Sequence, residues 1–136
     1  MEKTGKSVVL ACFGGFSNTG IATALASMDT VSEVGLDKAS IGCLSAIPLG
    51  TETVKIKCDA AKRIVVVDGC QKECAKKLVE RAGFRPYKSI VLVRDIGMKK
   101  RSLYDDPSVA GSEVANNVDA NEVLKAKELI VRTLNE

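Results

Sequence analysis

The stretch RIVVVDGCQKECAKKL at Arg63–Leu78 decides the fold. A fully apolar run, Ile64–Val67, ends at Asp68 and Gly69, and a segment with helical spacing of its apolar residues follows. An apolar run without polar alternation is typical of a strand that is buried on both faces, as in parallel sheets. The stretch therefore predicts a strand, a tight turn and a helix, which together form the repeating unit of an α/β fold.

The same alternation of strand and helix continues on both sides of this stretch. We expect strands at Ser7–Phe13, Ala39–Ile47, Arg63–Asp68 and Ser89–Arg94. We expect helices from Asn18 to about Met28, over Thr51–Lys62, over Gln71–Ala82 and after a cap at Asp119. The segment 51–62 fits a strand as well as a helix, and a helix is chosen because two parallel strands need a long crossover. The pattern predicts an α/β three-layer sandwich, with a four-stranded parallel sheet of order 2-1-3-4 and helices on both faces; the alternative order is 3-2-1-4.

Length and charge limit the classes of protein to which the chain can belong. Its 136 residues fit one α/β domain over 1–136, with a polar tail at 1–6 and a surface loop at 102–118. The net charge is only +3 and the basic residues are scattered, which argues against a nucleic-acid-binding face; the basic run Lys99–Arg101 is interpreted as a solvated loop. The sequence contains neither a membrane-spanning segment nor a signal-peptide pattern, so we expect a cytoplasmic protein without a membrane partner.

Four of the five cysteines stand at predicted element ends. Cys12 and Cys43 follow apolar runs, Cys70 stands where a helix is expected to begin, and Cys74 comes one turn later. Ligands of open parallel sheets bind at the carboxyl ends of the strands, and neighbouring strands lie ~4.8 Å apart, so we expect these four thiols to converge. Four thiolates suit tetrahedral zinc, whereas the absence of histidine excludes histidine-ligated sites and Ser–His or Cys–His catalysis. Cys58, in the middle of a predicted helix, is expected to pack in the core.

Other interpretations of the same thiols stay open. Buried cysteines often only fill space, so the four could be inert. A thiol-redox or thiol-transfer enzyme would use Cys70 as a nucleophile of low pKa. An iron–sulfur cluster would take the same four ligands as zinc. A fourth possibility is a scaffold for a protein partner, in which the metal ion only holds the loops in place.

Four further residues are expected to support the site. Asp68 is predicted to orient backbone amides or to accept a hydrogen bond behind a ligand, with a simple helix cap as the alternative. Gly69 is predicted to adopt a backbone angle that other residues resist, which would turn the next residue inward. The turn at Ser17 and Asn18 is expected to present Cys12.

Several motifs occur in one order along the chain. They are Cys12 with SNTG at Ser17–Gly20, CLSA at Cys43–Ala46, DGCQKECAKKLVERAG at Asp68–Gly83 and DIGMKK at Asp95–Lys100. Over roughly Val8–Lys100 the chain thereby resembles the DGC-domain family, described as zinc-binding proteins and named for an Asp-Gly-Cys motif. The resemblance implies a zinc site of structural or metal-handling role with Cys12, Cys43, Cys70 and Cys74 as ligands, and it brings no defined activity. Phe13 and Phe16 make the first loop bulkier than is usual in that family.

Overall fold

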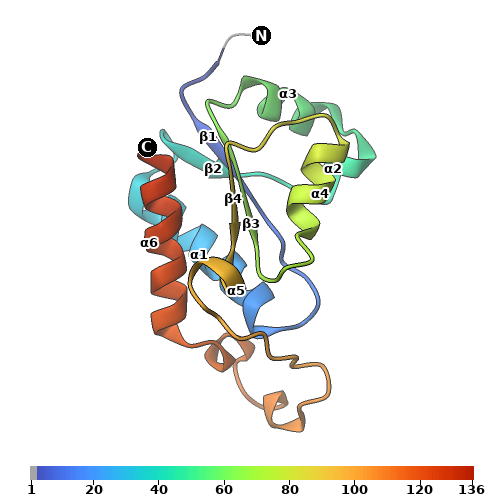
Figure 1. Ribbon diagram of the computed structural model, residues 1–136, viewed down its shortest axis with the longest axis vertical. Coiled ribbons are helices and arrows are strands. Elements are labelled where there is room, and N and C mark those ends of the chain that lie inside the picture. Colours follow the sequence, from blue (N-terminus) through green and yellow to red (C-terminus); the bar gives the residue numbers. More distant parts are fainter. Residues whose placement is uncertain (1–2) are drawn as a thin grey trace.

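The computed structural model describes residues 3–136 as a parallel sheet between two layers of helices (Figure 1). The strands are β1 (Ser7–Ala11), β2 (Ala39–Ile41), β3 (Ile64–Asp68) and β4 (Lys88–Val91). Their order is β2-β1-β3-β4, and every neighbouring pair is parallel. The predicted α/β class and the strand order 2-1-3-4 are confirmed.

Helices cover both faces of the sheet (Figure 1). One face carries α1 (Asn18–Val34), α5 (Leu92–Asp95) and α6 (Ala120–Leu134). The other face carries α2 (Ala46–Leu49), α3 (Glu52–Ala60) and α4 (Cys74–Arg81). The chain between α5 and α6 contains two short 3₁₀ helices, η1 (Pro107–Val109) and η2 (Val114–Asn117). Helix α3 confirms the choice of a helix for the ambiguous segment 51–62.

The two central strands hold the core together. Every residue of β3 is buried, as its run without alternation predicts. Its side chains divide between two apolar clusters, with Val65 and Val67 packed towards α1 and α6 and with Ile64 and Val66 packed towards α3 and α4. Each fully buried valine or isoleucine contributes roughly 1.5–3 kcal/mol relative to exposure. Cys58 is 3% exposed and lies in the second cluster, which confirms its prediction as a core residue.

Strand β2 is shorter than the sequence predicts. It ends at Ile41 rather than Ile47, and the last two residues of the predicted strand, Ala46 and Ile47, begin α2 instead. Gly42 follows directly and lies so close to β1 that a Cβ atom there would stand 2.6 Å from Cδ2 of Leu10. Periodicity cannot distinguish a short strand from a short buried helix, which is why the boundary was wrong. Strand β1 likewise ends at Ala11, before the predicted Phe13.

Two further boundaries differ from the prediction for local reasons. Strand β4 ends at Val91 rather than Arg94, because the Asp95 carboxylate accepts a hydrogen bond from the Val91 amide at 2.8 Å and the chain turns into α5. Helix α1 continues past the expected Met28 to Val34. Gly35 caps its C-terminal end, and the φ of 89° at this residue favours glycine.

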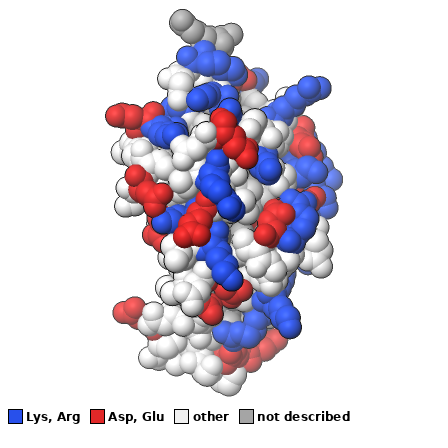
Figure 2. Space-filling model, turned by 60° about the vertical axis from the view of Figure 1, so that its left-hand side comes forward, with Lys and Arg blue, Asp and Glu red and all other residues white. Residues whose placement is uncertain are grey.

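The surface has a mixed charge pattern on the face drawn in Figure 2, where lysine and arginine side chains alternate with acidic ones. Among residues 3–136, none of the helices combines the length and the apolar character needed to cross a membrane.

Candidate functional site

The carboxyl ends of β1 and β3 meet at one edge of the sheet, and Cys12 lies there. Its amide donates to the Val67 carbonyl at 2.9 Å, which extends the β1–β3 pairing by one residue. Its carbonyl accepts a hydrogen bond from the Thr23 hydroxyl of α1 at 2.6 Å. The backbone of Cys12 is therefore fixed by the sheet on one side and by α1 on the other.

Helix α4 begins at Cys74 and not at the predicted Gln71. The Asp68 carboxylate explains the later start, because it accepts hydrogen bonds from the amides of Ala75 at 2.8 Å and Lys76 at 3.1 Å. These are amides of the first helical turn, which otherwise lack a partner within the helix. Asp68 is thus a helix cap across a turn, one of the two roles that the sequence left open.

The later helix start changes the setting of Cys70. This residue lies in the turn between β3 and α4, so it does not share a helix face with Cys74 as the sequence predicted. The carbonyl of Cys70 accepts from the amide of Glu73, which has a positive φ of 52°. The position of Cys70 is therefore set by a turn rather than by the exposed amides of a helix start.

Three thiols nevertheless act on one another at this edge, and we call Cys12, Cys70 and Cys74 the thiol cluster. The pKa of the Cys12 thiol is raised from 9.0 to about 11, first by burial and then by the negative charge of Asp68. The neighbouring thiols of Cys74 and Cys70 contribute to the same rise in pKa. Burial raises the pKa of Asp68 too, although the amides of Ala75 and Lys76 partly offset the rise. The cluster thus disfavours negative charge.

Cys43 stands apart from the thiol cluster. It is exposed, and its carbonyl accepts the amide of Ala46 at 3.2 Å in the turn that leads into α2. It is not among the groups that shift the pKa of Cys12. The structure therefore associates three of the four predicted ligand cysteines electrostatically and leaves Cys43 on the loop after the edge strand β2.

The side chains of Ser17 and Asn18 form hydrogen bonds at the start of α1, and their partners are backbone groups rather than a cysteine sulfur. The Ser17 hydroxyl accepts from the Gly20 amide at 3.2 Å as the helix cap. The Asn18 side chain accepts from the Arg101 amide at 2.6 Å and donates to the Lys99 carbonyl at 2.8 Å. Asn18 thereby holds the segment 99–101 against the start of α1.

This anchored segment brings Lys100 to the thiol cluster, which the sequence did not predict. The Lys100 ammonium lies 3.8 Å from the Cys70 sulfur. The basic run 99–101 was interpreted as a solvated loop, because nothing in its own composition shows that Asn18, far away in the chain, binds its backbone. The DIGMKK motif was the available signal, since it contains Lys100.

Gly69 matters for a reason other than the predicted one. Its φ is not among the positive values of the chain, so the expected special backbone angle is wrong. A Cβ atom at this position would instead stand 2.8 Å from Cβ and 2.9 Å from the carbonyl carbon of Thr19. Thr19 is 1% exposed and lies in the first turn of α1. Glycine is required here because the β3–α4 turn and α1 approach each other closely.

The donor chemistry of the thiol cluster fits a soft metal ion, since thiolate sulfur suits zinc. The side chains as they stand do not form a closed ligand set: within residues 3–136, no three or more cysteine or carboxylate groups are arranged so that they could hold a metal ion. The arrangement can thus provide sulfur donors at one place, and closure around an ion requires the side chains to move.

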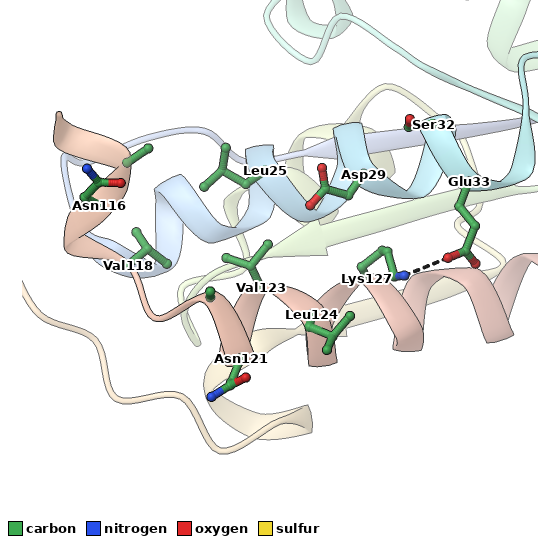
Figure 3. A pocket seen from close by; sticks show the side chains of 12 residues that line it. Leu25, Asp29, Ser32, Glu33, Asn116, Val118, Asn121, Val123, Leu124 and Lys127 are labelled. Atoms are coloured by element: carbon green, nitrogen blue, oxygen red, sulfur yellow. Dashed lines mark hydrogen bonds and ion pairs between the residues drawn. The ribbon is translucent and has the colours of Figure 1, made fainter.

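A pocket of about 940 Å³ lies elsewhere, between α1 and the segment that leads into α6 (Figure 3). Its lining contains none of the five cysteines. Lys127 of α6 reaches across it to Glu33 of α1 at 2.6 Å, and Asp29 lies on the same helix face as Glu33 (Figure 3). This groove joins two helices and is separate from the thiol cluster.

Comparison with known proteins gives one match. The family model described as DGC domain matches residues 8–121, which extends past the motifs that end at Lys100. No curated protein and no solved structure matches the chain.

Proposed function

The chain belongs to the DGC domain family, and from this premise and the clustered thiols we propose that it binds a zinc ion through thiolates. The proposed ligands are Cys12, Cys70 and Cys74, with Cys43 as the fourth. A site with four protein ligands has no open position for a substrate, so its role is structural or metal-handling rather than catalytic.

The observation that carries the proposal is the mutual effect of the thiol cluster and Asp68. Each of these acidic groups disfavours the charged form of Cys12, so deprotonating them together is costly without a cation. A divalent cation reverses this balance, because a coordinated thiol loses its proton. The cluster is therefore suited to a cation more than to isolated thiol chemistry.

Accessibility favours metal handling over a purely structural role. Cys43 and Cys74 are exposed, and Cys12 and Cys70 are half-buried. Structural zinc sites are closed, and an ion held by exposed ligands can be exchanged with a partner or a small thiol more readily. Lys100 beside Cys70 would offset part of the negative charge of a tetrathiolate site.

Elemental analysis of protein purified without added zinc tests the proposal. We expect one zinc ion per chain in the wild type and a large loss in Cys12→Ser and Cys70→Ser. Cys58→Ser is the matched control, because this cysteine is buried in the core and should leave the zinc content unchanged. Cys43→Ser separates a four-ligand site, which loses zinc, from a three-ligand site, which keeps it. Equal zinc content in all variants would overturn the proposal, and brown colour with visible absorption would replace zinc by an iron–sulfur cluster.

A second candidate is thiol exchange at Cys70, and the contact with Lys100 favours it. A thiolate at Cys70 would attack one sulfur of a substrate disulfide, form a mixed disulfide and release the other sulfur as a thiol. Alkylation of the full chain after removal of metal distinguishes the two candidates. Fast labelling of Cys70 that slows in Lys100→Gln but not in Lys99→Gln supports exchange, whereas uniformly slow labelling rejects it.

A further inference from the structure

A second site lies at the opposite end of the sheet from the thiol cluster. A pocket of about 360 Å³ opens between the end of α3, the turn into β3 and the loop between α4 and β4. This volume lies within the ~300–1,000 Å³ range of small-molecule sites. It is lined by Lys3, Cys58, Asp59, Ala61, Lys62, Arg63, Ile64, Gly83, Phe84, Arg85 and Tyr87.

Cationic side chains outnumber acidic ones in the lining of this pocket. Four lining residues are cationic, namely Lys3, Lys62, Arg63 and Arg85, and we call this set the basic pocket. Asp59 is the one carboxylate in the lining, so the pocket carries the same +3 that the complete sequence carries. Within residues 3–136, none of the four cations forms a salt bridge. The pocket therefore concentrates positive charge, and Glu136, which binds the Tyr87 hydroxyl of the lining, adds one carboxylate beside it.

Arg63 is held rigidly in this pocket. It precedes β3, and its carbonyl accepts the Val8 amide at 2.9 Å, which ties it to β1. Its guanidinium lies over the ring of Tyr87 at 4.3 Å, and the Tyr87 hydroxyl donates to Glu136 at 2.9 Å. The stacked ring fixes the plane of the guanidinium, which is the geometry that recognises a planar or tetrahedral oxyanion.

One donor of this fixed guanidinium is unused. Its Nη1 atom is buried and has no hydrogen-bond partner within residues 3–136. A buried donor without an acceptor costs roughly 1–3 kcal/mol. The Lys3 ammonium donates to the carbonyl of Asp59 at 2.8 Å, so it too lies beside the pocket without a carboxylate partner. Because protein atoms cover Nη1, an anion in the basic pocket would bind the other donors of the Arg63 guanidinium and the Lys3 ammonium.

We propose that the basic pocket binds the phosphate group of a small molecule. A phosphate offers several acceptor oxygens and a double negative charge, which match a rigid arginine surrounded by three mobile cations. The apolar walls, Ile64 and Phe84, accommodate the organic part of a monoester. The shared chemistry is the phosphate group, and its source is either free inorganic phosphate or a phosphomonoester.

Calorimetric titration of the full chain at low ionic strength tests the proposal, with inorganic phosphate and phenyl phosphate as probes. We expect saturable binding of at least one probe, weakened about tenfold in Arg85→Gln, since one charge-assisted hydrogen bond is lost. Arg63→Lys keeps the charge but loses the planar fork, so it should weaken binding to a similar degree. Lys125→Gln removes one exposed charge on α6 and should stay within twofold of the wild type.

The other results of this titration identify the kind of phosphate ligand and show whether its binding is specific. Tighter binding of phenyl phosphate identifies a monoester site, and equal or weaker binding identifies a phosphate site. Unchanged binding in Cys70→Ser separates this site from the thiol cluster. Absence of saturation by both probes up to about 10 mM overturns the proposal, as does equal weakening in Lys125→Gln and Arg85→Gln, because the binding would then be non-specific attraction.

Discussion

Replacement of Gly69 by alanine tests why the Asp-Gly-Cys turn contains glycine. The new methyl carbon would stand 2.8 Å from Cβ, 2.9 Å from the carbonyl carbon and 2.9 Å from Oγ1 of Thr19. Carbon atoms pack optimally at about 3.5–4.0 Å, so the shortfall is close to 1 Å at a side chain that is 1% exposed. Trimming Thr19 to serine would not relieve the clash, because Cβ and the backbone carbon remain.

The expected cost follows from overpacking. Extra methyl groups in a well-packed region destabilise by roughly 1–3 kcal/mol. For a chain of 136 residues, each kcal/mol lowers the melting temperature by about 3–5 °C, so we expect a loss of about 3–15 °C. The same displacement moves Cys70, so the zinc affinity of the proposed site should fall about 10–100-fold.

Urea denaturation and thermal melting followed by circular dichroism measure the change, and a competing zinc indicator measures the affinity. Gly14→Ala is the matched control, because a methyl group there meets only the Cys12 sulfur at 3.5 Å, an ordinary contact. Both substitutions reduce the freedom of the unfolded chain, which favours the folded state by about 0.4–1 kcal/mol. A Gly69→Ala protein as stable as Gly14→Ala would refute the close approach of the β3–α4 turn to α1.

Three other substitutions have defined outcomes. Asp68→Ala removes the acceptor of two backbone amides of α4 and should lower the free energy of unfolding, measured by urea denaturation, by about 0.5–2 kcal/mol. An unchanged free energy of unfolding would show that this helix cap does not stabilise the fold. The hydrogen bond from Arg94 is the main reason that the pKa of Asp95 lies below its usual value. The ionised Asp95 therefore stabilises the fold fully at pH values above its ordinary pKa of about 4, and this stabilisation is lost as the pH falls through the lowered pKa. Asp95→Asn should therefore be about 1–2 kcal/mol less stable than the wild type at pH 7, and the difference should shrink below pH ~4; a constant difference across this range contradicts the assignment. Cys58→Ser places a hydroxyl in the apolar cluster and should cost about 1–3 kcal/mol in the same assay, and an unchanged stability would show that the thiol is not tightly packed.

The class and strand order were predictable because they depend on long apolar runs. The run 64–67 is rich in β-branched residues and ends at Asp68 and Gly69, which favoured a doubly buried strand, and the structure places it in the centre of the sheet. The short segments 44–47 and 92–94 were assigned to strands and form helical turns, because a few apolar residues fit either structure. Their outcome depends on contacts with β1 and on the Asp95 hydrogen bond, which no local pattern records.

The candidate site was predictable in part for the same reason. Cys12 and Cys70 follow the two central strands, so parallel topology alone brings them to one edge. The position of Lys100 depends on two hydrogen bonds between the Asn18 side chain and a segment more than 80 residues away. The requirement for Gly69 depends on the packing of Thr19 against the β3–α4 turn. Such long-range contacts are properties of the folded chain and leave no periodic trace in the sequence.

The pairing of β1 with β3 also determines when the thiol cluster can assemble. Val8 pairs with Ile64, and the connecting chain contains α1, β2, α2 and α3. At about 5–20 residues per second, a ribosome delivers Cys70 roughly 3–12 s after Cys12, and the two strands cannot pair before then. For these seconds Cys12 lacks the sulfur atoms of Cys70 and Cys74, its two partners in the thiol cluster. Ion capture by the complete set therefore has to wait for the synthesis of Cys74, when β1, β2 and β3 have already been made.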